Sequence, residues 1–193
     1  KIFGILNGTC NYILTEMRDT GRSFDDVLNE AKELGYAEND PTLDINGTDA
    51  AHKLSILASL AFGTKLNFNA VKIEGISEIA ALDIGFAKEL GYGIKLLGVA
   101  SFENGVMEQR VQPCMVLNKS PINKVEGAFN AVVINGEFFD SLFLEGRGAG
   151  AGPTASAVVS DIVDIARGRG APPFGIEIDD LQETDILLQR ELE

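Results

Sequence analysis

The chain has 193 residues, of which 45% are hydrophobic and 23% charged, as is typical of a soluble globular domain with a core of its own. Its 29 acidic and 16 basic residues give a net charge of −13, which argues against nucleic acid or an anionic membrane as the main partner, since both need a basic surface. The two cysteines form no CxxC pair and no apolar run approaches the roughly 20 residues of a membrane span, so we expect a reduced, cytoplasmic protein without a signal peptide.

The first part of the chain predicts a strand followed by helices. KIFGIL at residues 1–6 has strand character, and residues 11–19 are predicted to be helical. SFDDVLNEAKELG predicts a clearer helix between its N-cap, Ser23, and Gly35 at its end.

Two further helices are predicted before the periodicity changes. TDAAHKLSILASLAFG predicts a buried helix with Thr48 as its N-cap and Gly63 as its end. The next helix is predicted from Glu78 to Leu90.

Two hairpins follow, each at an Asn-Gly dipeptide, which favours the type I′ turn. The first joins residues 94–102 to 106–113 through Asn104 and Gly105, and the second joins residues 130–134 to 137–146 through Asn135 and Gly136.

A last helix is predicted from Pro153 to about Arg167, because proline suits a first helical position. Helices, then hairpins, then a helix indicate an α+β fold, with a mixed, mainly antiparallel sheet and helices packed on one face. We expect one domain over residues 1–175, and a tail or linker over residues 176–193.

Residues 35–53, GYAENDPTLDINGTDAAHK, concentrate carboxylates immediately before a predicted helix. A solvated surface loop is the plain interpretation. A calcium loop fits poorly, because Gly47 is fourth rather than sixth from the first aspartate of DINGTD and no glutamate closes the loop. We predict no metal here, since a ligand that carries an ammonium group is a better partner for these carboxylates.

On the helix that follows, Asp49 and Lys53 lie one turn apart, on a line that continues as Ile56 and Leu60. An exposed line should stay polar, and this one becomes apolar. The plain interpretation is an i,i+4 ion pair worth about 0.3–0.5 kcal/mol if it is exposed. The functional interpretation is a lysine at the edge of a pocket, held by Asp49 and able to transfer a proton.

The single histidine, His52, shares the polar flank of the same helix with Ser55 and Ser59. A solvated surface histidine is therefore the simpler interpretation than a catalytic one.

A second unusual stretch is GRGAGAGPTASAVVSD at residues 146–161, where alternating glycines run into the predicted last helix. Backbone N–H groups at such a helix start can receive an anion. The stretch lacks the third glycine of G-x-G-x-x-G, so tight packing of the helix against the sheet explains it nearly as well.

Four stretches together resemble the homoserine dehydrogenase family. They are GILNGTCNYIL, GYAENDPTLDINGTDAAHKLSILA, GIKLLGVA and GRGAGAGPTASAVVSDIVDIA, and they cover about residues 1–175 in order. The resemblance implies an oxidoreductase that interconverts L-homoserine and L-aspartate 4-semialdehyde with NAD or NADP, on the route to threonine and methionine. It also implies a homodimer.

Carried onto this sequence, the resemblance implies roles for individual residues. Lys53 would be the acid/base residue, supported by Asp49. The substrate would be bound by Glu38 and Asp44 at its amino group, with Gly8, Thr9 and Tyr36 completing the pocket wall, and the nicotinamide side of the cofactor would meet Gly148, Gly150 and Thr154. No role transfers to His52.

The sequence departs from the family pattern in one respect. The family's N-terminal nucleotide-binding domain, with a further active-site lysine, has no counterpart here, so we expect a fragment that is inactive alone, with NAD or NADP bound mainly by that domain. Two other functions stay open: a non-catalytic dimerisation or amino-acid-binding module, and a Schiff-base lyase that uses Lys53. Nearby carboxylates make the lyase less favoured, because they stabilise a protonated lysine.

Overall fold

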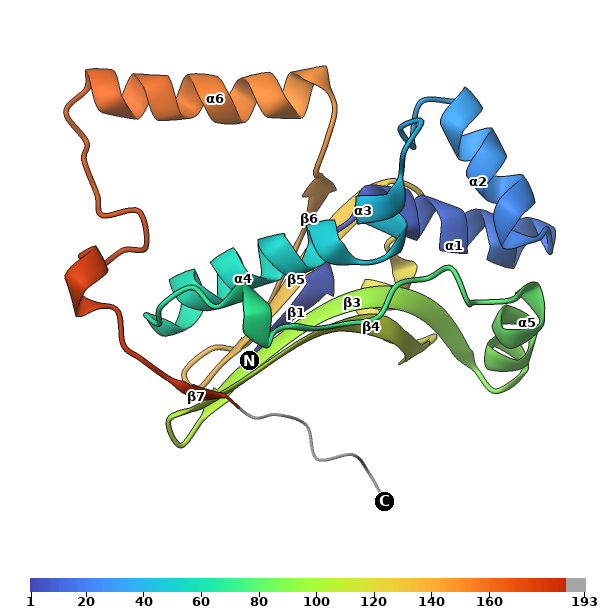
Figure 1. Ribbon diagram of the computed structural model, residues 1–193, viewed down its shortest axis with the longest axis horizontal. Coiled ribbons are helices and arrows are strands. Elements are labelled where there is room, and N and C mark those ends of the chain that lie inside the picture. Colours follow the sequence, from blue (N-terminus) through green and yellow to red (C-terminus); the bar gives the residue numbers. More distant parts are fainter. Residues whose placement is uncertain (187–193) are drawn as a thin grey trace.

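The computed structural model describes residues 1–186 and confirms the predicted α+β class (Figure 1). Its sheet is mixed, with strand order β2-β4-β3-β1-β5-β6 and β7 paired to β4. The strands are β1 (Ile2–Ile5), β2 (Lys72–Ile73), β3 (Tyr92–Glu103), β4 (Val106–Leu117), β5 (Phe129–Gly136), β6 (Asp140–Arg147) and β7 (Asp185–Ile186). The short β1 lies between β3 and β5 and is antiparallel to both, with Phe3 opposite Val99 and Val133.

The helices lie mainly on one face of this sheet (Figure 1). They are α1 (Gly8–Thr20), α2 (Phe24–Glu33), α3 (Thr42–Ile45), α4 (Thr48–Phe62), α5 (Ala81–Glu89) and α6 (Ala151–Ala166), with short 3₁₀ turns at Phe68–Ala70, Pro121–Lys124 and Ile178–Asp180. The larger core cluster fills the space between α1, α4 and the sheet, and includes the fully buried Ile13 and Leu54. A smaller cluster around Val99, Ile122 and Val133 lies on the opposite face of the sheet.

Several helix starts differ from the predicted ones because local polar contacts decide them. Gly47, with φ of 85°, is the N-cap of α4 in place of Thr48, whose own N–H donates to Asn46 Oδ1 at 2.9 Å. Helix α5 begins at Ala81, not Glu78, because the Asp83 carboxylate accepts the N–H of Ala80 at 2.9 Å.

The starts of α1 and α6 lie before the predicted residues. Asn7 accepts the N–H of Cys10 and is the N-cap of α1, which places the first turn at Gly8 and not at residue 11. In α6 the first residue is Ala151, so Pro153 is third in the helix.

The first predicted hairpin is confirmed, with Asn104 and Gly105 at φ of 53° and 82°. The turn of the second hairpin lies elsewhere. Asn135 stays in β5 because its N–H donates to the carbonyl of Lys1 at 2.8 Å, and Gly136 pairs with Asp140. The turn is therefore residues 137–139, and Asp140 takes the positive φ of 55°.

Helix α6 lies apart from the sheet, and none of its residues is buried (Figure 1). Tight packing of this helix against the sheet therefore does not explain the glycine stretch that precedes it. In the tail, Gln182 bonds to the backbone of Gly63 and Lys65, and β7 pairs with β4, so its described part returns to the domain. The domain boundary at residue 175 stays a prediction, and residues 187–193 of the predicted tail lie outside the described residues.

Within residues 1–186, no helix is both long enough and apolar enough to cross a membrane. Both cysteines are free thiols, Cys10 buried and Cys114 partly buried.

Candidate active site

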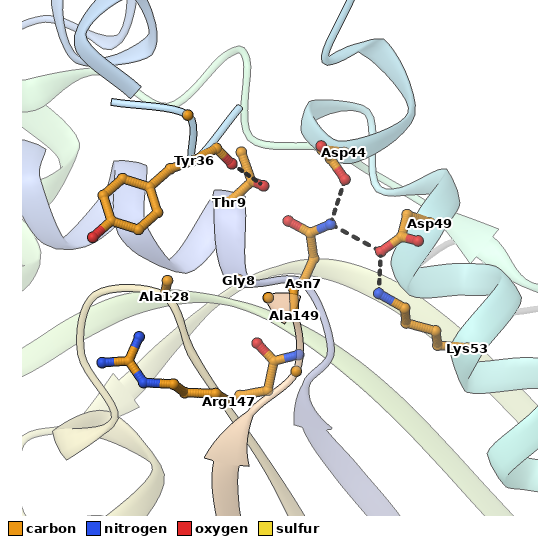
Figure 2. Close-up of a pocket in the computed structure, with 14 residues that line it drawn as sticks. Asn7, Gly8, Thr9, Tyr36, Asp44, Asp49, Lys53, Ala128, Arg147 and Ala149 are labelled. Atoms are coloured by element: carbon orange, nitrogen blue, oxygen red, sulfur yellow. Dashed lines mark hydrogen bonds and ion pairs between the residues drawn. The ribbon is translucent and has the colours of Figure 1, made fainter. Parts of the chain in front are cut away.

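A cavity of about 360 Å³ lies where β1 runs into α1, next to the start of α4 and the end of β6 (Figure 2). It brings together eight of the ten residues singled out in the sequence: Gly8, Thr9, Tyr36, Asp44, Asp49, Lys53, Gly148 and Gly150. Glu38, exposed on the loop after Tyr36, and Thr154, exposed in α6, are not part of its lining. Residues from five separate segments of the chain therefore share one pocket.

Asn7 connects the carboxylates of this pocket. Its side-chain nitrogen donates to Asp44 Oδ1 at 2.7 Å and to Asp49 Oδ2 at 2.9 Å, while its side-chain oxygen caps α1 (Figure 2). Two carboxylates this close repel each other, and a shared amide donor offsets part of that repulsion. The acidic loop is therefore fixed to the N-terminus of α1.

Lys53 is one turn along α4 from Asp49, as the helix period predicts. Its ammonium group donates to Asp49 Oδ2 at 2.6 Å and to the carbonyl of Leu6 at 3.3 Å. The side chain is 48% exposed, so the ion pair with Asp49 contributes little to stability by itself. Asn7, Asp49 and Lys53 nevertheless form a continuous chain of hydrogen bonds within the pocket, which an isolated surface pair would not.

The other residues of α4 show that two exposures expected from the helix period were wrong. Ile56 and Leu60, which continue the Asp49–Lys53 line, are 45% and 46% exposed. Ser55 and Ser59 are buried, with their hydroxyls bonded to the carbonyls of His52 and Thr64. Serines can be buried on a helix when backbone carbonyls accept their protons. His52 is exposed, as predicted, and packs against Phe68.

The opposite wall of the pocket is backbone held by close contacts. Thr9 Oγ1 donates to the carbonyl of Tyr36 at 2.9 Å, and the Tyr36 ring stacks on Tyr12 at 4.5 Å. A Cβ on Gly8 would lie 2.9 Å from the backbone carbonyl of Ala128, so the close backbone favours glycine there. A Cβ on Gly148 would meet the side-chain amide of Asn130, which would have to turn away.

Cys10 lies beneath the acidic loop and is not a nucleophile. Burial, with the nearby charges of Asp44 and Asp49, raises the pKa of its thiol far above the ordinary value. Its Sγ donates to the carbonyl of Asp44 at 3.1 Å. The thiol therefore supports the loop rather than reacting with a ligand.

Six lining residues were not predicted from the sequence, and three of them are polar: Asn7, Asn130 and Arg147. Asn7 could have been found, since an asparagine directly before a helix is an N-cap signal. Asn130 and Arg147 come from two paired strands, and only the register of β5 against β6 brings them to the pocket. The Arg147 guanidinium lies 4.8 Å from the centre of the Phe129 ring.

The pocket sets the Asp44 and Asp49 carboxylates beside the Lys53 ammonium group, an arrangement able to accept hydrogen bonds from a cationic ligand and to donate a proton. Among the described residues, no group of three or more histidine, cysteine or carboxylate side chains could hold a metal ion.

Comparison with known proteins places this arrangement in a known family. A family model described as homoserine dehydrogenase matches residues 1–163. The homoserine dehydrogenase of Neisseria gonorrhoeae is 53% identical over 167 residues, which cover 86% of this chain and 38% of that protein. The one of Pseudomonas aeruginosa is 51% identical over 170 residues, which cover 88% and 39%.

A solved structure shares the fold closely. The crystal structure of a homoserine dehydrogenase from Thiobacillus denitrificans matches with a TM-score of 0.91 at 48% identity, over 96% of this chain and 44% of that one. The chain therefore spans less than half the length of the relatives it matches.

Proposed function

The chain belongs to the homoserine dehydrogenase family, and on that premise we propose that its pocket binds L-homoserine and L-aspartate 4-semialdehyde and takes part in their NAD(P)-dependent interconversion. It would be the substrate-binding part of an oxidoreductase of threonine and methionine biosynthesis. The observation that carries the proposal is the chain of contacts from Asn7 through Asp49 to Lys53, with Asp44 beside it, in one pocket.

The acidic wall suits the α-ammonium group of the substrate. Asp44 and Asp49 both accept a hydrogen bond from the same donor, Asn7 Nδ2. The remaining lone pairs of the two carboxylates can accept hydrogen bonds from a ligand. Glu38 lies outside the lining of this pocket, and its contact with the substrate amino group stays a prediction.

Lys53 is placed to exchange a proton with the substrate oxygen at C4. During aldehyde reduction its ammonium group gives a proton to the carbonyl oxygen, and during homoserine oxidation the amine takes the hydroxyl proton. The Asp49 carboxylate, 2.6 Å away, holds the Lys53 side chain in place in both directions of the reaction. NAD(P) supplies or accepts the hydride when it is bound.

The glycine loop would meet one edge of the nicotinamide. Gly148 and Gly150 leave this rim of the pocket as bare backbone, and Gly148 lies against the side-chain amide of Asn130. Among the described residues, Asn130 Oδ1 is a buried acceptor without a hydrogen-bond partner. Thr154, one turn into α6, stays a predicted contact of the cofactor, and most of the nucleotide would be bound outside this chain.

A homodimer and a cytoplasmic location complete the proposal. On the face of the sheet opposite the helices, the partly exposed Phe3, Cys114 and Phe143 are apolar residues that a second copy would cover, and both cysteines are free thiols. A non-catalytic dimerisation or amino-acid-binding module is the alternative, and it would share this face without needing Lys53.

The test is the substitution Lys53→Met in an enzyme of the relatives' full length that includes this chain, since we expect the chain alone to be inactive. Removal of the proton donor should lower kcat about 10²–10⁴-fold. The KM for homoserine should change little, because Asp44 and Asp49 remain. Initial rates in both directions measure the effect, and His52→Ala, on the exposed flank of α4, is the matched control. A rate equal to that of the unchanged enzyme would reassign Lys53 to a structural role.

A further inference from the structure

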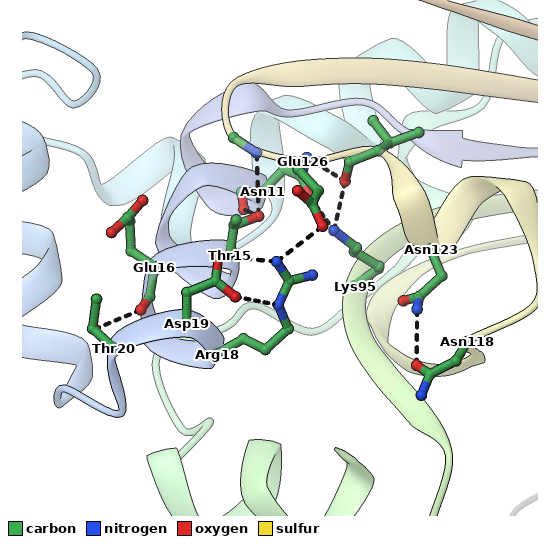
Figure 3. A network of polar contacts seen from close by, with 12 residues as sticks. Asn11, Thr15, Glu16, Arg18, Asp19, Thr20, Lys95, Asn118, Asn123 and Glu126 are labelled. Carbon is green, nitrogen blue, oxygen red and sulfur yellow. Dashed lines mark hydrogen bonds and ion pairs between the residues drawn. The ribbon is translucent and has the colours of Figure 1, made fainter.

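Lys95 is a buried lysine with no part in the pocket lining. It lies on β3 and is 2% exposed. Its ammonium group donates to Asn11 Oδ1 at 2.9 Å and to the carbonyl of Val125 at 2.6 Å (Figure 3). A buried ammonium group is costly, so its contacts need an explanation.

Lys95 and its neighbours on α1 bind one stretch of backbone, residues 125–129, which we call the 125–129 segment. Asn11 Nδ2 donates to the carbonyls of Val125 and Phe129, both at 3.1 Å. Thr15 Oγ1 accepts the N–H of Gly127 at 3.3 Å. Two side chains of α1 and one of β3 therefore hold this segment by its backbone.

The same segment forms a wall of the pocket. Ala128 lies in it and Asn130 directly follows it, and both line the cavity that contains Asp49 and Lys53. The carbonyl of Ala128 lies so close to Gly8 that a Cβ there would be 2.9 Å away. A shift of the segment would thus move one side of the pocket against the start of α1, while Asp49 and Lys53 stay on α4.

The charge of Lys95 fits this task. Burial lowers its pKa to about 8, helped by the nearby Arg18 guanidinium, while Glu126 and Asp19 act in the opposite direction. Arg18 itself is paired with Asp19 and Glu126, and Cys114 is the cross-strand neighbour on β4. At neutral pH the group is therefore still mainly an ammonium ion, and its hydrogen bonds to Asn11 and Val125 are charge-assisted, the stronger kind.

We propose that Lys95 is a positioning residue of the substrate pocket, which it shapes by holding the 125–129 segment against α1. That the ligand is homoserine rests on the proposed function, whereas the effect on the segment does not.

The experiment compares the chain with its Lys95→Met variant, which keeps an unbranched side chain and removes the donors. Amide hydrogen exchange of the 125–129 segment should become about tenfold faster or more, as expected when a buried charge-assisted hydrogen bond is lost. Exchange in β3 and β4 away from residue 95 should change much less. Affinity for L-homoserine, from calorimetric titration, should fall about three- to tenfold.

Two further variants separate positioning from general stability. Val27→Ala, at a fully buried site of α2 outside the pocket, should lower the thermal midpoint while leaving exchange of the segment and homoserine affinity unchanged. Thr15→Val removes the acceptor for Gly127, together with the bond that the same hydroxyl donates to the Asn11 carbonyl within α1, and should speed exchange of the segment in the same direction, by a smaller factor. It provides the test if Lys95→Met fails to fold.

The outcomes are distinct. If Lys95→Met and Thr15→Val leave exchange of the segment unchanged, or if Val27→Ala alters it equally, the inference is overturned. Faster exchange with unchanged homoserine affinity also overturns it, because the segment would then not shape the pocket. If the unchanged chain binds no homoserine, the proposed function is overturned, and a segment that exchanges no faster in the variants would overturn the positioning role separately.

Discussion

Asn7 uses both ends of one amide group. Its oxygen accepts the N–H of Cys10 and caps α1, and its nitrogen donates to Asp44 and Asp49. Capping alone would be served as well by serine, threonine or aspartate. Only an amide also supplies the donor that lets two carboxylates lie side by side, so this single residue both starts a helix and lines the pocket.

The substitution Asn7→Ser should separate these two roles. Serine keeps the cap but loses at least one of the two bonds to the carboxylates, so the free energy of unfolding should fall by about 1–3 kcal/mol. Its hydroxyl is too short to reach both carboxylates, so we expect about tenfold weaker binding of L-homoserine. Binding of 4-hydroxybutanoate, which lacks the ammonium group, should not weaken. Calorimetric titration of both ligands measures this, and equal homoserine affinity in the variant would show that the amide orients neither carboxylate.

At the scale of elements, the second hairpin shows how pairing decides a turn. Asn135 and Gly136 have the residue types of a type I′ turn, but Asn135 is bonded to the backbone of Lys1 and remains in β5. Asp140 then adopts the positive φ, a conformation that aspartate tolerates less well than glycine does. A two-residue motif favours a turn only when no neighbouring strand competes for its backbone groups.

Two substitutions test this hairpin. Asp140→Gly should raise the free energy of unfolding by about 0.5 kcal/mol, because glycine adopts the φ of 55° without steric cost. Gly136→Ala should lower it slightly, since a Cβ there would displace the Phe139 ring, which is 56% exposed and can turn away. Urea denaturation measures both. If Gly136→Ala were as stable as the unchanged chain, the packing of the Phe139 ring over Gly136 would contribute nothing to stability.

At the scale of the whole molecule, residues 1–186 leave apolar surface uncovered in two notable places. One is α6, whose Val158, Val159 and Ile162 are more than half exposed. The other is the sheet face opposite the helices, where the partly exposed Phe3 and Cys114 line a shallow cavity of about 400 Å³ together with the buried Leu97. Exposed apolar patches of this kind mark interaction surfaces, and the second supports the proposed homodimer.

The dimer is tested through Phe3→Glu, which places a charge on that sheet face, because Phe3 is paired with Val99 of the smaller core cluster. The unchanged chain should sediment as a dimer, and the variant should sediment as a monomer at the same concentration, because an unpaired charge is costly at a dry interface. Leu82→Glu, at a 66% exposed site on α5, is the matched control and should leave the dimer intact. A monomeric unchanged chain would contradict the proposal.

Local sequence was sufficient for much of this molecule. The α+β class, the hairpin at Asn104, and the one-turn spacing of Asp49 and Lys53 were all predicted correctly, because helix period, caps and turn dipeptides act over a few residues. The same local signals were wrong by two or three residues at the starts of α1, α5 and α6, where a side chain or backbone contact decided.

Tertiary structure alone decided the composition of the pocket. Asn7 is more than a hundred residues away in sequence from Asn130 and Arg147, and the three meet only because β1 pairs with β5 and β5 with β6. It also decided that Lys95 is buried against α1, although nothing in GIKLLGVA distinguishes this lysine from one on the surface. Burial and register depend on contacts distant in sequence, whereas the residue types able to bind an ammonium group and transfer a proton can be recognised in GYAENDPTLDINGTDAAHK by itself.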